Sequence, residues 1–185
     1  MDAIKAKTKN ITLCAVMIAL ATGLSLVPLY IAPFGGTVTL GSMVPLVLVC
    51  VMIRDYRWSV LTCFAYSLIQ MLTGFTAPPT KTFLAFSEVV LLDYVVAFTV
   101  ISVANPISKL FKNKILGIAV GSVAALSGRF LCHFASGILI WSMYAENLPV
   151  WLYSLLYNGG YMLPELIITT IASTVIFGVM KKKKA

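Results

Sequence analysis

The chain has 185 residues, of which 60% are hydrophobic and only 11% are charged, and its mean hydropathy is +0.97. Soluble domains carry about 25% charged residues, so this composition excludes a soluble globular protein and indicates an integral membrane protein. The formal net charge of +8 comes mostly from the ends and the short loops, so it does not indicate nucleic-acid binding.

Six apolar stretches divide the chain. A helix that crosses a bilayer needs about 20 apolar residues, with a range of about 17–25. The predicted spans are 11–29, 38–53, 58–72, 83–104, 115–141 and 152–180. We expect Asn105-Pro106 to end the fourth span and a break near residues 159–164 in the last. The prediction is an all-α integral membrane protein, with residues 1–185 forming one six-helix domain.

Basic residues mark one side of this predicted bundle. The N-terminal tail, the loops after the second and fourth spans, and the C-terminal tail hold three, two, three and four basic residues, which is twelve of fourteen. The opposite loops hold only Lys81, and Arg129 lies inside a span. By the positive-inside rule both termini are therefore predicted to be cytoplasmic. We also expect Lys181 to Lys184 to contact the anionic inner leaflet.

Motifs of catalysis are missing from the sequence. It contains no Walker A sequence, GxGxxG, HExxH or nucleophile elbow, and no internal repeat of the kind found in many carriers. The cysteines stand singly in apolar segments, as small buried residues do and metal ligands do not. They are Cys14, Cys50, Cys63 and Cys132. The chain is predicted not to be an enzyme and to hold no metal.

Ionisable residues inside the spans gather toward the end predicted to lie outside. Asp93 follows Glu88 by five residues in the fourth span, and Arg129 and His133 lie one helical turn apart in the fifth. Polar groups at membrane depth are costly, so they usually face a cavity or each other. The cluster can be a binding pocket or only a polar contact between helices. Arg129 can pair with Asp93, or instead with Glu88 or Glu165.

Aromatic residues lie at the same level as this cluster. They are Trp141, Tyr144, Trp151, Tyr153, Tyr157 and Tyr161. Tyr144 and Trp151 are typical of an interfacial belt, whereas Trp141 continues the helical face of His133. A carboxylate beside aromatic rings and an amide suits a flat cationic ligand, because a cation against a desolvated ring gains about 2 kcal/mol.

Small residues form a stripe on the first span. Ala15 and Ala19 are four residues apart, and Gly23 follows at the same spacing. Such a stripe permits close packing against another helix. Alanine is common, so the spacing can also arise by chance.

Taken together, these segments resemble the thiamine-specific S component of energy-coupling-factor (ECF) vitamin transporters. The resemblance extends over nearly the whole chain. The segments that carry it are 35–45 (GGTVTLGSMVP), 91–98 (LLDYVVAF), Arg129 with 133–137 (HFASG), 141–145 (WSMYA), and 151–159 (WLYSLLYNG) with Tyr161 and Pro164-Glu165. Several spaced motifs in the right order make the resemblance specific.

The resemblance implies a function and a set of partners. It implies a six-helix protein of the prokaryotic cell membrane that binds thiamine from outside. It also implies that the stripe of Ala15 and Ala19 docks on a transmembrane coupling subunit, while two ABC ATPases supply the energy. The implied partners are therefore thiamine, these subunits and the lipid bilayer.

The resemblance also implies the ligand contacts. The family positions correspond to Asp93, His133, Trp141, Tyr153 and Asn158. Some members carry Glu at the position of Asp93, so the carboxylate here is one methylene shorter. In the family the first outer loop acts as a lid, and some members have a tryptophan there. This chain has no tryptophan in that loop, and Phe34 is the nearest aromatic candidate for the same contact. Phe83 also resembles a family contact.

Four other functions remain open at this point. The chain can be an S component for a different vitamin, a stand-alone secondary carrier, a small membrane enzyme, or a structural helix-packing partner. A carrier needs an ion-coupling route that the sequence does not specify, and an enzyme needs the missing catalytic motifs. Binding of labelled thiamine to the purified protein separates the first two of these from the last two. Dependence of uptake on the coupling subunit and ATP separates an S component from a carrier.

Overall fold

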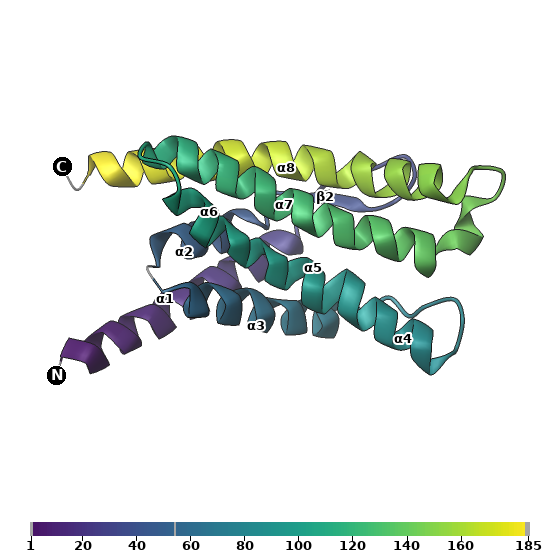
Figure 1. Cartoon of the computed structure of the whole chain (residues 1–185), viewed down its shortest axis with the longest axis horizontal. Helices are drawn as coiled ribbons and strands as arrows, with labels where there is room; N and C mark the ends of the chain where they lie inside the picture. Colours follow the sequence, from purple (N-terminus) through teal and green to yellow (C-terminus); the bar gives the residue numbers. More distant parts are fainter. Residues whose placement is uncertain (1, 54, 184–185) are drawn as a thin grey trace.

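The computed structural model describes residues 2–53 and 55–183; Arg54 and Lys184, which entered the predicted charge distribution, lie outside these ranges. Long helices run side by side along one axis, with a short β-hairpin against them (Figure 1). The described chain has six helical segments, as predicted: α1, α2, α3, a composite helix from α4 to α6, α7 and α8. Several boundaries differ from the prediction, and these differences shape the site.

The first helix and the segment after it differ from the predicted first span, 11–29. α1 (Asp2–Ser25) starts earlier, because lysine is a good helix former and the basic tail continues the helix. It ends before Pro28, where strand β1 (Pro28–Ile31) begins. β1 pairs antiparallel with β2 (Thr37–Thr39). β-branched and aromatic residues around a glycine turn favour this hairpin over a helix.

The predicted second span, 38–53, is wrong as a complete crossing. Its residues form β2, a turn and the nine-residue helix α2 (Val44–Met52). Nine residues rise about 13.5 Å, less than half of the roughly 30 Å hydrocarbon core. Leu46, Val47, Val49 and Cys50 of α2 are fully buried. An apolar run reads the same whether it faces lipid or protein, so hydropathy alone could not distinguish a lipid-facing helix from this internal one.

The fourth helical segment is long and irregular. It consists of α4 (Phe83–Val89), the π-helical turn η1 (Val90–Val95), α5 (Val96–Thr99), the 3₁₀ turn η2 (Val100–Val103) and α6 (Ala104–Lys109). The predicted end at Asn105-Pro106 is wrong, because helix continues to Lys109. Pro106 lies in the first turn of α6. A backbone N–H at this position has no hydrogen-bond partner within α6, so the N–H that proline lacks is not needed there.

The last two helices form the longest pair. α7 (Lys114–Leu139) is capped by the preceding Asn113, whose side chain accepts hydrogen bonds from the N–H groups of Ile115 and Leu116. A short turn, η3 (Ser142–Ala145), leads to α8 (Val150–Lys182). The predicted break near residues 159–164 is wrong, since α8 stays helical through Pro164. Membrane helices tolerate proline where neighbouring helices support the backbone, and α7 packs along α8 (Figure 1).

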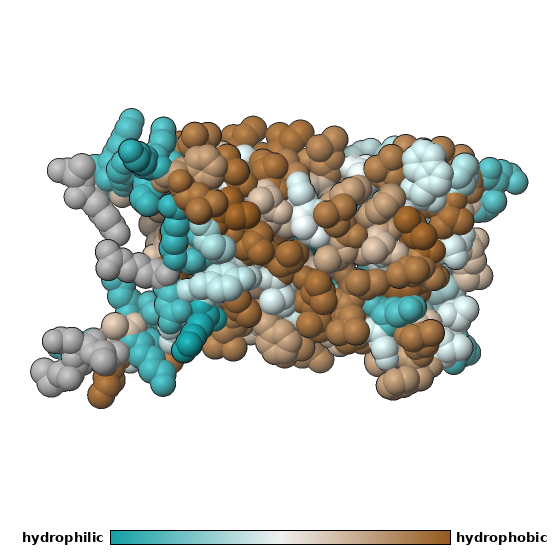
Figure 2. All heavy atoms as spheres, in the orientation of Figure 1, coloured by the Kyte–Doolittle hydropathy of each residue, from teal (hydrophilic) through white to brown (hydrophobic). Residues whose placement is uncertain are grey.

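Several features identify a multi-pass membrane protein. Four helical segments among the described residues are long and apolar enough to cross a bilayer: Ile4–Ser25, Phe83–Lys109, Lys114–Leu139 and Val150–Lys182. α3 (Tyr56–Gly74) has 19 residues but includes more polar ones. Hydrophobic atoms form a broad band between more hydrophilic ends (Figure 2). α1 begins and α8 ends at the same end of the molecule (Figure 1); which side of the membrane this end faces remains a prediction.

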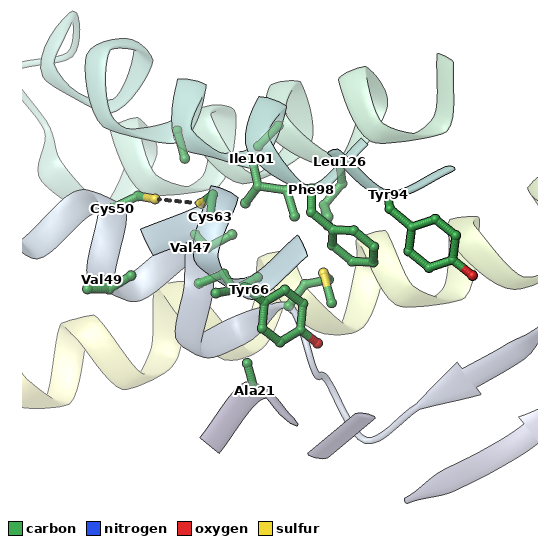
Figure 3. Packing of buried hydrophobic residues seen from close by; sticks show 14 of the residues in the cluster. Ala21, Val47, Val49, Cys50, Cys63, Tyr66, Tyr94, Phe98, Ile101 and Leu126 are labelled. Carbon is green, nitrogen blue, oxygen red and sulfur yellow. Dashed lines mark hydrogen bonds between the residues drawn. The ribbon is translucent and has the colours of Figure 1, made fainter. Parts of the chain in front are cut away.

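A buried core joins α2, α3 and α5 (Figure 3). The ring of Tyr66 meets that of Phe98 edge-on, with centroids 5.3 Å apart. Cys50 and Cys63 are free thiols with sulfur atoms 3.6 Å apart. Together with Cys14 they are buried, as the sequence predicted, while Cys132 is partly exposed. This packing fixes the inner wall of the composite helix that carries Asp93.

Candidate functional site

A cavity of about 510 Å³ lies toward the end opposite the two termini, between η1, α7, α8 and the hairpin. This volume is within the usual range for small-molecule sites. Its lining residues are Phe34, Thr76, Asp93, Tyr94, Phe98, His133, Gly137, Trp141, Tyr144, Tyr153, Tyr157, Asn158 and Tyr161. Six of the seven predicted ligand contacts are therefore in one place. The exception is Phe83, which is 86% exposed and lies outside the cavity.

Asp93 is the central acidic group of the cavity. It lies in the π-helical turn η1, and such turns in helices often occur at functional sites. His133 Nδ1 is 3.2 Å from Asp93 Oδ1, and Trp141 Nε1 donates to Asp93 Oδ2 at 3.0 Å. The carboxylate is thus tied to two residues that come from α7 and the segment directly after it.

Within the part of the chain that the structure describes, His133 has one ring nitrogen without a hydrogen-bond partner. The side chain is only 13% exposed, and its Nε2 atom is buried without a hydrogen-bond partner among the described residues. Buried polar atoms nearly always have a partner. The nitrogen that lacks this partner belongs to a residue that lines the cavity.

Arg129 does not pair with Asp93, which resolves the alternatives left open by the sequence. Its Nη1 lies 3.8 Å from Glu165 Oε2, and its guanidinium lies over the Phe98 ring, 4.7 Å from the centroid. The other oxygen of Glu165 accepts hydrogen bonds from the backbone N–H of Thr39, at 2.8 Å, and from its hydroxyl. Both charged residues are at least nine-tenths buried. The ion pair thus connects α7 and α8 to strand β2 and leaves Asp93 to the cavity.

Thr39→Val is expected to lower the unfolding free energy by about 1.5–3 kcal/mol, because it removes a hydrogen bond to a buried charged group while keeping the β-branched shape. The measurement is thermal unfolding of the purified protein in detergent. Thr37→Val, on the exposed part of the same strand, is the matched control and should change little. Equal losses in the two variants would contradict a specific role for the bond between Thr39 and Glu165.

Close packing of α7 on α8 positions Asn158. Its Nδ2 donates to the carbonyl oxygens of His133 and Ser154, both at 3.1 Å, and its Oδ1 accepts from the Tyr161 hydroxyl at 3.3 Å. A Cβ atom at Gly137 would overlap Ser154 Oγ. Glycine is therefore required at this position for the helices to approach each other. This contact holds the amide at the cavity wall.

The turn of the hairpin contributes to the cavity lining. Phe34 lies at its turn and is 48% exposed. Gly35 and Gly36 follow with φ of +103° and +78°, which favours glycine, and a Cβ at either would overlap Tyr157 or Tyr161. The turn thus rests on the tyrosines of α8, which holds Phe34 in the cavity lining.

Sequence reasoning missed several cavity residues. Tyr144 was assigned to the interfacial belt, but it lines the cavity and packs on Trp141 with ring centroids 6.1 Å apart. Tyr157 and Tyr161 were left unassigned, although with Tyr153 they repeat every four residues and so share one helical face. Tyr94 donates to the Gly74 carbonyl and accepts from Thr76 N–H, and no pattern in the sequence indicated this loop contact.

The arrangement can bind a flat cation that also forms hydrogen bonds. One carboxylate, an imidazole nitrogen and an amide lie among aromatic rings, and aromatic faces attract cations in a desolvated site. Mostly apolar walls with a few placed polar groups are the usual form of a small-molecule site. The chemistry therefore agrees with the ligand class inferred from the sequence.

Comparison with known proteins gives the family. A family model described as thiamine transporter protein (Thia_YuaJ) matches residues 11–185. The thiamine transporter ThiT of Bacillus subtilis (strain 168) is 32% identical over 182 residues, covering 90% of this chain and 85% of that protein. ThiT of Lacticaseibacillus paracasei is 27% identical over 100 residues, covering 49% of this chain and 48% of that protein.

The fold is also found in a solved structure. ThiT from Listeria monocytogenes superposes with a TM-score of 0.78 at 21% identity, covering 96% of this chain and 97% of that chain. That likeness shows the fold, while the family match and the Bacillus subtilis relative extend over most of the chain. The protein therefore belongs to the thiamine transporter protein family.

Proposed function

We propose that this protein is the thiamine-binding S component of an ECF importer, which captures thiamine from outside for ATP-driven uptake by associated subunits. The observation that carries the proposal is the Asp93 carboxylate, joined to His133 and Trp141 in an aromatic cavity of about 510 Å³. Family membership supports the choice of thiamine over another flat cation.

The chemistry of thiamine fits the groups in this cavity. Its thiazolium ring carries a fixed positive charge, and its aminopyrimidine ring offers both donors and acceptors. Asp93 can act as counter-ion or as acceptor for the amine, and the rings of Trp141 and Tyr153 offer stacking surfaces. His133 Nε2 and Asn158 can then bond the ring edges, with Phe34 closing the mouth.

The charge distribution supports entry from outside. The basic loops and tails gather at the end where α1 begins and α8 ends, and Figure 2 shows that end as strongly hydrophilic. Basic loops face the cytoplasm. The cavity lies toward the other end, so in this orientation it opens to the exterior of a prokaryotic cell.

The exposed face of α1 supports a membrane partner. Ala15 and Ala19 are exposed, and a Cβ built at Gly23 would meet nothing within 4 Å. A stripe of small residues open to the bilayer lets another helix approach closely. We assign this stripe to the coupling subunit; a stand-alone carrier would have no use for it.

Thiamine titration of the purified protein tests the proposal. Quenching of tryptophan fluorescence should saturate, because Trp141 lines the cavity. Riboflavin, a flat vitamin without a fixed positive charge, is the control and should not compete. Saturation by riboflavin alone would favour an S component for another vitamin. Thiamine uptake that persists without the coupling subunit and ATP would favour the secondary carrier.

A further inference from the structure

A second cavity, of about 440 Å³, lies at the opposite end of the molecule from the thiamine cavity and shares no residue with it. The end of α2, the end of α6, the start of α7 and the end of α8 enclose it. Its lining residues are Val51, Met52, Ile53, Ser108, Lys109, Lys114, Ile118, Phe177 and Lys181.

The charged residues that line this second cavity, among those the structure describes, are lysines. Lys109, Lys114 and Lys181 come from three different helices, and no carboxylate is among the lining residues. Three ammonium groups at one cavity repel each other unless an anion lies between them. The lining therefore favours a group with negative charge and several acceptor oxygens, as a phosphate has.

Buried polar contacts build the wall of this cavity. Asn105 is fully buried, and its Nδ2 donates to the carbonyl oxygens of Cys50, at 2.6 Å, and Ile53, at 2.8 Å. Asn105 thereby fixes the end of α2, which forms one side of the cavity. Its Oδ1 accepts from Lys109 Nζ at 2.6 Å. At least one of the three ammonium groups is therefore positioned by the interior of the protein.

Apart from Ser108, the other lining residues are apolar. Val51, Met52, Ile118 and Phe177 line the same space as the lysines. The cavity lies near the end of α8, at the basic end of the molecule (Figure 1). A free inorganic anion gains nothing from apolar walls, whereas a molecule with both a phosphate and hydrocarbon does. Basic pockets between membrane helices on the cytoplasmic side bind anionic headgroups in this way.

We propose that this second cavity binds the phosphate headgroup of an anionic phospholipid, with part of the lipid's glycerol and acyl region against Phe177 and α2. The site goes beyond the proposed function, and its assignment to the inner leaflet rests on the orientation proposed above. Each lysine near an anionic lipid contributes about fivefold in affinity, so removing all three should weaken binding by about a hundredfold.

The test uses the full-length protein in detergent with phosphatidylglycerol as the probe. Bound lipid is counted by native mass spectrometry, and the shift in melting temperature is followed as lipid is added. The parent should retain phosphatidylglycerol and gain thermal stability from it, and phosphatidylcholine should do neither. The variant Lys109→Gln, Lys114→Gln, Lys181→Gln should lose both effects but still bind thiamine, which shows that it has folded.

The matched control is Lys5→Gln, Lys7→Gln, Lys9→Gln, which removes the same charge from the same end without touching the cavity. It should behave as the parent does. If both triple variants lose lipid retention and the lipid-induced stability equally, the proposal is overturned, because the lipid is then held only by the general attraction between its charge and the basic end of the protein. Full competition by inorganic phosphate would show that the cavity binds a free anion instead of a lipid.

If the triple lysine variant retains lipid as the parent does but loses ECF-dependent uptake, the lysines contact a partner protein and the lipid site is wrong. If the triple variant does not fold, the single variant Lys181→Gln replaces it in the test. It should still lose bound lipid, by a smaller amount.

Discussion

Asp93→Asn is expected to weaken thiamine binding by at least about a hundredfold. Asp93 is the acidic group of the cavity, its side chain is only 14% exposed, and His133 and Trp141 both bond to it. Removing one partner of a buried charged contact costs about 3–5 kcal/mol, and about 1.4 kcal/mol is tenfold in affinity. The asparagine keeps the shape but loses the charge that balances the thiazolium, so affinity falls while the fold remains.

The measurement is tryptophan-fluorescence titration of the purified variants with thiamine. Asp93→Glu should be milder, because the charge survives and only its reach changes. Glu88→Gln is the matched control: it removes the same charge from the same composite helix, outside the cavity, and should bind as the parent does. If Asp93→Asn folds and binds thiamine normally, then Asp93 serves only to orient His133 and Trp141, and the ligand lies elsewhere.

Ala19→Trp and Ala15→Trp are expected to abolish thiamine uptake by the assembled transporter while leaving thiamine binding unchanged. Both alanines lie on the exposed face of α1, away from the lining of the thiamine cavity. Close helix contact depends on small residues at the seam, and an indole there prevents the approach. Two assays on the same preparation separate the effects: ligand titration of the purified protein, and ATP-dependent uptake in vesicles with the coupling subunits.

Leu20→Trp is the control for bulk on this helix. Leu20 is 51% exposed and points about 100° away from Ala19, since a helix turns once in 3.6 residues. It should face lipid and keep most of the uptake. Loss of thiamine binding in Ala19→Trp would show that the two surfaces are not separate. Equal loss of uptake in Leu20→Trp would show that any tryptophan on α1 disturbs assembly, and the stripe would lose its special role.

The sequence by itself determined the membrane character and much of the site chemistry. Hydropathy alone marked the long helices α7 and α8 within a few residues, because a long apolar run has few alternatives in a bilayer. Asp93 and His133 could be chosen from sequence because polar groups at membrane depth are costly and therefore informative. Trp141 continues the helical face of His133, and Asn158 was indicated only by the family resemblance. The structure brings these four side chains to one cavity.

Only the tertiary structure decided how the shorter segments are used. The run that became β2 and α2 is as apolar as a membrane span, and packing of α2 against α1, α3, α6 and α8 made it a core element. The partner of Arg129 could not be chosen either, because Asp93, Glu88 and Glu165 are equally acidic and only their positions differ. Packing of α7 on α8 places Glu165 beside Arg129, so Asp93 bonds instead to His133 and Trp141 at the cavity. Pairing in a folded chain depends on distances between residues far apart in sequence, and hydropathy does not record these distances.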